Sequence, residues 1–394
     1  MNGGAFFEQE DVRPPVARVR LPDPDDTLHI RCDVRVVLRL YRDRTEESFS
    51  SHDPVTVLFR KSGITVKTAA GVALGSDLTG VVIYASESNA PLFLNKSPFF
   101  GSLVIGREDH RERMVINRLN LEKYLEGVLT PELGERAPNE FEAIKAQAVA
   151  SRTYALAHLG QYPDAPYDLR ADVSDQLYVG ASQQRDWVDR AVQATRGEVL
   201  MTDGSLIEAY YHSTCGGRTE AIQDVWPKSP KPYLVSVDDD TSCQWSKYSE
   251  WTETFDQKTL LANLREYRKQ LHPPPIPDFD RVMDIRMEGE TQGGRYRRMV
   301  VITPQAHWVI AADQIRWALG RPSRPGTILP SSRFKLDLTR GEDGRVQRVV
   351  ITGSGYGHGV GMCQCGMIGR ARAGETYKPI LLHYYTGARI VKLY

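Results

Sequence analysis

The sequence has no excess of charge of either sign and no long apolar run. Lysine and arginine total 50, and so do aspartate and glutamate, so the formal net charge is zero. This balance argues against a protein that holds nucleic acid by bulk electrostatics, which requires a positive excess. No apolar stretch is long enough to cross a bilayer, so no transmembrane segment is expected. The opening stretch MNGGAFFEQEDVRPP lacks the basic segment and apolar core of a signal peptide, so none is expected there.

Cysteine is also scarce, with five residues in 394: Cys32, Cys215, Cys243, Cys363 and Cys365. Cys32 lies in LHIRCDVRVVLRL, where apolar and polar residues alternate as in a strand, which predicts a buried core thiol. The other four lie in or near two glycine-rich stretches, HSTCGG (212–217) and HGVGMCQCG (358–366). Four thiolates from three segments could form a closed tetrahedral zinc site. Two disulfides, favoured by export, and unpaired core thiols are the alternatives.

The apolar and charged contents, 41% and 25%, are those of a globular protein with a real core. Alternating, β-branched segments over residues 16–118 predict a mainly β region. Helical spacing begins after Asn120, a plausible N-cap, and Pro131 is expected to end that helix. Further helices are predicted at these positions: 139–160 (capped by Asn139), 187–197 and 257–271. Later strands at RVMDIRM, YRRMVVIT and VQRVVITG complete a mixed α+β chain.

The predicted helix over 139–160 is rich in alanine and carries a polar and aromatic stripe. Gln147, Ser151, Tyr154 and His158 are spaced so that they share one face. Such a stripe on an alanine-rich helix is typical of the wall of a site, although a solvated helix face is the simpler interpretation.

Glu132 follows Pro131 in TPELGERAPNEF, where we expect a loop. A carboxylate there can be an ordinary solvated loop residue. It can also be a general acid, if Leu133 and a tight loop bury it enough to raise its pKa. Glu126 and Glu135 compete for the same role.

The two glycine-rich stretches offer further polar groups in turns shaped around a ligand or another backbone. His212 and Ser213 lie in the first stretch and His358 in the second. Neither stretch matches the GxxxxGK[ST] pattern that holds phosphate. A catalytic cysteine with His212 or His358 as its base is a further hypothesis.

Three segments together resemble the SpoIID/LytB family, the stage II sporulation protein D and amidase-enhancer proteins of bacteria. They are LEKYLEGVLTPELGERAPNEFEAIKAQAVASRTYAL, YHSTCGGRTE and GYGHGVGMCQCGMIGRARAGETYKPILLHYYTGA, in the family's order. The resemblance covers roughly residues 85–394 and implies a catalytic domain there, preceded by a β-rich region over 1–84. It also implies an α+β fold with a β-rich N-terminal module, a central helical region and a C-terminal mixed β portion around one cleft.

The resemblance implies a peptidoglycan lytic transglycosylase that acts on glycan strands stripped of stem peptides. The family's catalytic glutamate falls on Glu132, which would protonate the glycosidic oxygen between N-acetylmuramic acid and N-acetylglucosamine. The resulting carboxylate would take the proton from the C6 hydroxyl, which closes onto C1 as a 1,6-anhydro ring. A single residue therefore suffices, unlike the paired carboxylates of ordinary glycoside hydrolysis. No cofactor is required.

The resemblance also implies residues that line a glycan cleft or support its floor, with support the more natural role for Arg152. The expected substrate-binding residues are Gln147, Arg152, Tyr154, His212, Ser213, His358 and Gln364. The chain departs from the family where some members have a zinc-binding THCQ cluster, because RADVSDQLYVG contains neither histidine nor cysteine. In place of HSTSGG and HGVGMSQYG it carries cysteines, and Cys243 completes a set of four. We expect a structural zinc, or a thiol cluster, on Cys215, Cys243, Cys363 and Cys365.

Two other functions stay open. One is a noncatalytic glycan-binding protein that enhances a cell-wall amidase, and the other is a zinc- or cysteine-dependent hydrolase. A peptidoglycan substrate predicts a location in the cell envelope or outside the cytoplasm.

Overall fold

The computed structural model describes residues 13–108 and 112–394, which form two compact units. The first unit covers the described residues up to Glu208 together with Ile390–Tyr394, and the second covers Ala209–Arg389. Most of the opening stretch discussed above lies outside the described residues. Strands and helices are mixed along the chain, which confirms the predicted α+β class.

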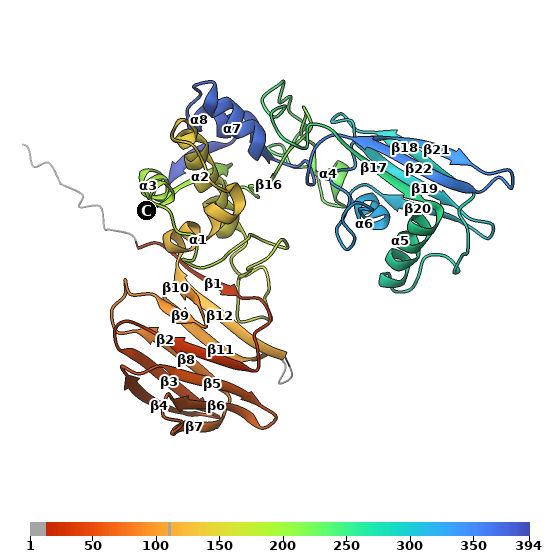
Figure 1. Cartoon of the computed structure of the whole chain (residues 1–394). Helices are drawn as coiled ribbons and strands as arrows, with labels where there is room; N and C mark the ends of the chain where they lie inside the picture. The colour runs from red at the N-terminus through yellow and green to blue at the C-terminus, as the bar shows by residue number, and fades with distance from the viewer. Residues whose placement is uncertain (1–12, 109–111) are drawn as a thin grey trace, which may run out of the picture. The chain divides into compact units, whose positions relative to one another are not determined.

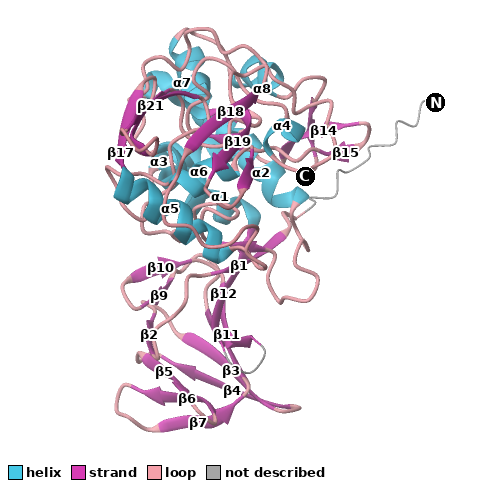
Figure 2. Cartoon of the chain, turned by 90° about the vertical axis from the view of Figure 1, so that its right-hand side faces the viewer, coloured by secondary structure: helices cyan, strands magenta, loops and turns pink. Residues whose placement is uncertain are grey.

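The N-terminal part of the first unit consists of two sheets of mostly antiparallel strands (Figures 1 and 2). One sheet has the order β13-β1-β12-β11-β8-β3-β4 and the other β10-β9-β2-β5-β6-β7. Their strands are β1 (Val16–Arg20), β2 (Thr27–Arg31), β3 (Val36–Arg42), β4 (Thr45–Ser51), β5 (Val55–Arg60), β6 (Gly63–Thr68), β7 (Ala73–Leu78), β8 (Gly80–Ala85), β9 (Leu92–Leu94), β10 (Ser97–Phe99), β11 (Ser102–Glu108), β12 (Glu112–Asn120) and β13 (Leu169–Arg170).

Alternating burial explains why these segments form strands. Every second side chain of β3, β5 and β8 is buried, as period-2 patterning requires for a sheet with one covered face. β3 and β7 belong to different sheets and are in contact, so the covered faces lie against each other. The boundary proposed between residues 84 and 85 stays a prediction, and it falls inside β8, which pairs with β11 in one sheet.

Cys32 departs from the prediction of a buried core thiol. The alternating stretch forms two strands, β2 and β3, and Cys32 lies in the connection between them, half-buried. Its sulfur donates to the carbonyl oxygen of Pro91 at 3.2 Å. Alternation continued across the turn, so periodicity alone did not reveal the break.

Helices form the rest of the first unit, together with a three-stranded sheet of order β15-β14-β24. These elements are α1 (Leu121–Leu133), a 3-10 helix (Pro138–Glu140), α2 (Phe141–Ala157), α3 (Asp186–Ala194), β14 (Glu198–Thr202), β15 (Ser205–Leu206) and β24 (Arg389–Lys392). Asn120 caps α1 as predicted, since its side chain accepts from the amide of Glu122 at 2.8 Å. Asn139 does not cap α2, because it lies inside the 3-10 helix.

The prediction that Pro131 ends the first helix was wrong. α1 continues to Leu133, so Glu132 lies in its last turn rather than in a loop. Proline has no amide hydrogen for the carbonyl of Gly127, but that oxygen accepts from the amide of Val179 at 3.3 Å. A partner from another segment thus replaces the missing helical hydrogen bond, and the helix ends at Leu133 with Gly134 as its C-cap.

The second unit contains two three-stranded sheets, of orders β17-β22-β21 and β18-β19-β20, and a two-stranded parallel pair of β16 and β23. Its elements are β16 (Tyr211–His212), α4 (Ile222–Val225), β17 (Trp251–Asp256), α5 (Gln257–Gln270), β18 (Asp284–Glu290), β19 (Tyr296–Ile302), β20 (His307–Ala311), α6 (Gln314–Leu319), β21 (Phe334–Arg340), β22 (Val346–Gly353), β23 (Met362–Cys363), α7 (Gln364–Arg372) and α8 (Tyr377–Tyr384). An apolar core lies between α5, α6 and the two larger sheets. Among the described residues, no helix combines the length and apolarity needed to span a bilayer.

Candidate functional site

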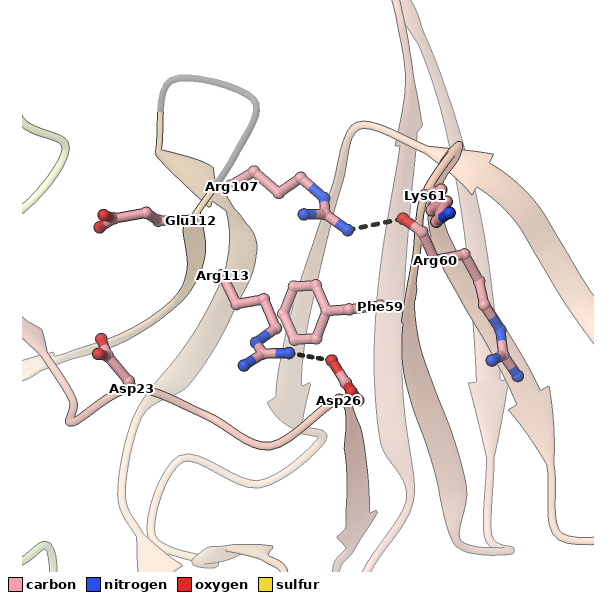
Figure 3. A pocket seen from close by; sticks show the side chains of 8 residues that line it. All are labelled: Asp23, Asp26, Phe59, Arg60, Lys61, Arg107, Glu112 and Arg113. Carbon is pink, nitrogen blue, oxygen red and sulfur yellow. Dashed lines mark hydrogen bonds and ion pairs between the residues drawn. The ribbon is translucent and has the colours of Figure 1, made fainter.

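A hollow of about 700 Å³ in the N-terminal β region carries none of the predicted site residues (Figure 3). Its charged groups are largely matched to one another. Arg113 pairs with Asp26, Arg107 donates to the carbonyl of Arg60 at 2.6 Å, and Glu112 lies 3.5 Å from Arg20. This pairing is typical of a structural hollow rather than of a catalytic site.

Glu132 lies half-buried at the end of α1. One of its carboxylate oxygens accepts from the amide of Leu177 at 3.0 Å. The buried ring of Tyr124 lies close by. Burial, and then the negative charges of Asp175 and Glu132, raises the pKa of Tyr124 well above its usual value. Tyr124 therefore keeps its proton and donates to Gln176 Oε1 at 3.0 Å. Glu132 is thus positioned by a backbone amide, beside a neutral tyrosine.

The polar stripe of α2 packs on the same 175–177 segment. Gln147 donates to Ser151 Oγ at 3.0 Å, and Gln176 donates to the carbonyl of Ser151 at 3.4 Å. Tyr154 stacks on His158 with ring centroids 3.9 Å apart, and its hydroxyl lies 3.5 Å from Asp175. The stripe is thus not a solvated helix face. Its members that were expected to bind substrate, Gln147 and Tyr154, lie within one hydrogen-bonded network beside Glu132.

Arg152 has a different environment. Its side chain is fully buried, and it makes two hydrogen bonds to the carboxylate of Glu122, at 2.8 and 2.7 Å. It also donates to the carbonyls of Val192 and Glu198 at 3.4 and 3.2 Å. A guanidinium with this many internal acceptors and no exposed surface supports the helices, so Arg152 is not retained among the candidate substrate contacts.

The two glycine-rich stretches lie side by side in the second unit. β16 and β23 pair in parallel, with Tyr211 opposite Met362 and His212 opposite Cys363. The alternate glycines 355, 357, 359 and 361 all have positive φ, between 71° and 104°. At Gly361 a side chain would place Cβ 2.1 Å from the carbonyl oxygen of Tyr210. Glycine is therefore required there for the two backbones to approach.

His212 and His358 are neighbours, with ring centroids 5.5 Å apart. Burial lowers the pKa of His358 to about 4 and that of His212 well below its usual value, so both are neutral at neutral pH. His358 accepts from the amide of Val360 through Nδ1 at 3.1 Å, while Nε2 lies 3.0 Å from the carbonyl of Tyr211. Within the described residues, Nε2 of His212 is buried and has no hydrogen-bonding partner.

Two aromatic residues that the sequence analysis did not single out border these histidines. Trp226 lies 4.8 Å from the ring of His358, and Tyr210 lies 5.0 Å from Trp226, measured between centroids. Both are half-buried. Ser213 is half-buried beside them, whereas Gln364 is almost fully buried at the start of α7. This group of polar and aromatic side chains is suited to contact with sugar rings.

The cysteines divide differently from the prediction. Cys215, Cys243 and Cys363 lie together with Asp239, and their ligand atoms are all within 4.8 Å of one another. Burial raises the pKa of Asp239 to about 6. Cys365 lies outside this group, half-buried, with its sulfur 3.3 Å from the hydroxyl of Thr214.

The structure thus gives two groups of candidate residues, each within one unit. Glu132, Gln147 and Tyr154 lie in the first unit, and His212 and His358, with the cysteines, lie in the second. In the sequence, the segment 170–180 was notable only for its lack of histidine and cysteine. Its aspartate at 175 and the following glutamine, as a polar pair after a long helix, were the signal that could have identified that part of the network.

Comparison with known proteins agrees with the motifs. The family model described as Stage II sporulation protein matches residues 109–202, and a domain of unknown function (DUF8618) matches residues 242–361. An uncharacterized protein of Brachyspira hyodysenteriae is 28% identical over 395 residues, covering 98% of this chain and 94% of that protein.

Named relatives come from two species of Bacillus. The amidase enhancer of Bacillus subtilis is 30% identical over 298 residues, covering 68% of this chain but only 40% of that protein. Stage II sporulation protein D of Bacillus amyloliquefaciens is 29% identical over 293 residues, covering 70% of this chain and 75% of that protein. With the three motifs in order and these matches, the chain belongs to the SpoIID/LytB family.

Proposed function

We propose that this protein acts on the bacterial cell wall as a lytic transglycosylase. It would cleave the bond between N-acetylmuramic acid and N-acetylglucosamine in glycan strands that lack stem peptides. The observation that carries the proposal is the position of Glu132. This residue stands where the family's motif has its catalytic glutamate, and its carboxylate is held in place by the amide of Leu177.

The local structure suits an acid that later becomes a base. Glu132 lies in the last turn of α1. This turn contains no basic residue, and at this end of a helix the dipole opposes a negative charge. The protonated carboxyl would donate its proton to the glycosidic oxygen as the bond from C1 to that oxygen breaks. The carboxylate would then accept the proton of the C6 hydroxyl while O6 bonds to C1. The proton balance closes without water, and the product end is 1,6-anhydro-N-acetylmuramic acid.

The second unit, taken by itself, carries a separate group of candidate residues for sugar binding. We propose His212, Ser213 and His358, with the adjacent ring of Trp226, as contacts for hydroxyl and acetamido groups. Neutral imidazoles can donate or accept hydrogen bonds, and an indole face packs on the apolar face of a sugar ring. Nε2 of His212 is buried and has no hydrogen-bonding partner among the described residues, so a ligand group that reached it would satisfy it. Gln147 and Tyr154 would order the network next to Glu132.

The test is mass spectrometry of stem-peptide-free glycan strands after incubation with the wild type or with Glu132→Gln. Glu135→Gln is the matched control, because Glu135 is exposed and pairs with Arg185 on the surface. Anhydro ends from the wild type and from Glu135→Gln, but not from Glu132→Gln, are expected. Intact strands with every variant, despite co-sedimentation with the glycan, would replace the proposal with the alternative below.

That alternative is a noncatalytic glycan-binding protein that enhances a cell-wall amidase. Similarity to the amidase enhancer of Bacillus subtilis favours it. Both functions require glycan strands as a partner and an envelope location, but only the enzyme needs the proton of Glu132.

A further inference from the structure

We propose that Cys215, Asp239, Cys243 and Cys363 bind one zinc ion as a structural site in the second unit. The four residues are fully or almost fully buried, and their ligand atoms converge on one point. They come from three segments: the loop after β16, the 239–243 turn, and the start of α7. The site is independent of the glutamate chemistry proposed above.

The distances fit a tetrahedron around zinc. With zinc–sulfur bonds of about 2.3 Å, two sulfur ligands lie about 3.8 Å apart. The sulfurs of Cys215 and Cys243 are 3.5 Å apart, and Asp239 Oδ2 is 3.2 Å from Cys215 Sγ. A covalent disulfide would bring the sulfurs to about 2.05 Å. All five cysteines are free thiols in the structure.

Backbone amides point at the sulfurs as they do around metal-bound thiolates. Cys363 Sγ accepts from the amides of Cys215 and Gly366 at 3.2 and 3.3 Å. Cys215 Sγ accepts from the amide of Gly217 at 3.3 Å. These donors favour the deprotonated form of the sulfurs, which is the form that binds a metal.

The surroundings of the carboxylate and of α7 complete the site. Asp239 Oδ1 accepts from the hydroxyl of Tyr384 at 2.5 Å, and Arg370 Nε lies 3.6 Å from it, so Oδ2 remains directed at the sulfurs. Cys363 caps the nine-residue helix α7, whose positive end offsets the excess negative charge of three thiolates and one carboxylate. At Gly366 a Cβ would lie 2.1 Å from Asp239 Oδ2, so only glycine lets α7 approach the ligand.

The ligand set indicates zinc and a structural role. Thiolates with a single oxygen ligand favour zinc over magnesium or calcium, which prefer oxygen alone. Four protein ligands leave no open position for water, and burial leaves no route for substrate. The ion would therefore hold the 212–217 loop, the 239–243 turn and the start of α7 together, which fixes the neighbouring histidines.

The first test is the metal content of the full-length protein, purified without chelator from cells grown with zinc. Elemental analysis is expected to give one zinc per chain. Cys365→Ser and Cys32→Ser should keep it, because neither residue belongs to the group, whereas Asp239→Asn and Cys243→Ser should lose most of it. Zinc retained by Asp239→Asn but lost by Cys365→Ser would overturn the ligand set.

Cobalt provides a test that does not depend on how well a variant folds. Replacement of the metal in the wild type by Co²⁺ should give intense d–d bands of a tetrahedral site with sulfur-to-cobalt charge transfer, unchanged in Cys365→Ser. The thiols are counted in parallel, by alkylation under denaturing, non-reducing conditions with chelator and intact-mass measurement. Five alkylated cysteines are expected. Two unreactive cysteines, or a folded wild type that binds neither metal, would refute the zinc site.

Discussion

The variant Arg152→Met tests whether Arg152 supports the packing of the helices or contacts the substrate. The substitution keeps much of the volume of the side chain but removes both hydrogen bonds to Glu122. Breaking a buried ion pair on one side typically costs about 3–5 kcal/mol, because the remaining charge stays buried. Glu122 keeps one partner, the hydroxyl of Tyr394 at 2.6 Å, which should place the loss near the lower end.

The assay is urea unfolding at neutral pH, followed by circular dichroism. Arg152→Met should lower the free energy of unfolding by about 3 kcal/mol. The control is Arg185→Met, which breaks an exposed pair with Glu135 and should cost less than about 1 kcal/mol. The double variant Glu122→Gln with Arg152→Met should lose less than the sum of the single losses, because each single change leaves a buried partner unmatched.

A result of the opposite kind would refute this assignment. If Arg152→Met unfolds at the wild-type urea concentration while anhydro-sugar formation or glycan binding falls sharply, Arg152 acts on the substrate. The guanidinium would then have to leave its buried position in the working protein.

Two further predictions concern packing and pH. Gly127→Ala should lower stability by about 1–3 kcal/mol in thermal unfolding, because its Cβ would lie 2.5 Å from the ring of Tyr178; an unchanged midpoint would contradict the close packing of α1. The free energy of unfolding should fall as the pH drops from about 6.5 to about 4. Over this range His358 takes up a proton in the unfolded chain but stays neutral in the folded protein. The loss should be about 3 kcal/mol at most. It should be smaller in His358→Gln but unchanged in the control His307→Gln, whose side chain is exposed. Identical pH profiles of the wild type and His358→Gln would refute this prediction.

Local chemistry allowed much of the fold to be predicted from the sequence. Asn120 caps α1 because its short side chain reaches a free amide, and the strands follow from alternation over a covered face. The end of α1 could not be predicted in this way. Whether Pro131 stops a helix depends on a partner for the carbonyl of Gly127, and that partner, Val179, lies 52 residues further along the chain.

The candidate sites show the same limit. The three cysteines of the proposed zinc site could be identified by residue type. The fourth ligand could not, because the sequence indicated Cys365 whereas the proposed site contains Asp239. The CxC spacing puts Cys363 at the start of α7 and directs Cys365 toward Thr214, so both cannot face one ion. Asp239 carried no signal of its own, because an aspartate in the acidic run VDDDT is indistinguishable from a solvated one until the fold buries it.

The region between the two glycine-rich stretches also has a structural role. This region, matched by a domain model over residues 242–361, folds mainly as two three-stranded sheets with α5 and α6. Arg295 extends from it, fully buried, and lies 3.5 Å from Glu220. Its guanidinium donates to the carbonyl of Gly357 at 3.1 Å and to that of Cys215 at 3.5 Å. One side chain of the intervening region thus contacts the first stretch and the residue that precedes the second. These contacts help two segments about 150 residues apart to keep a register that two short parallel strands could not hold alone.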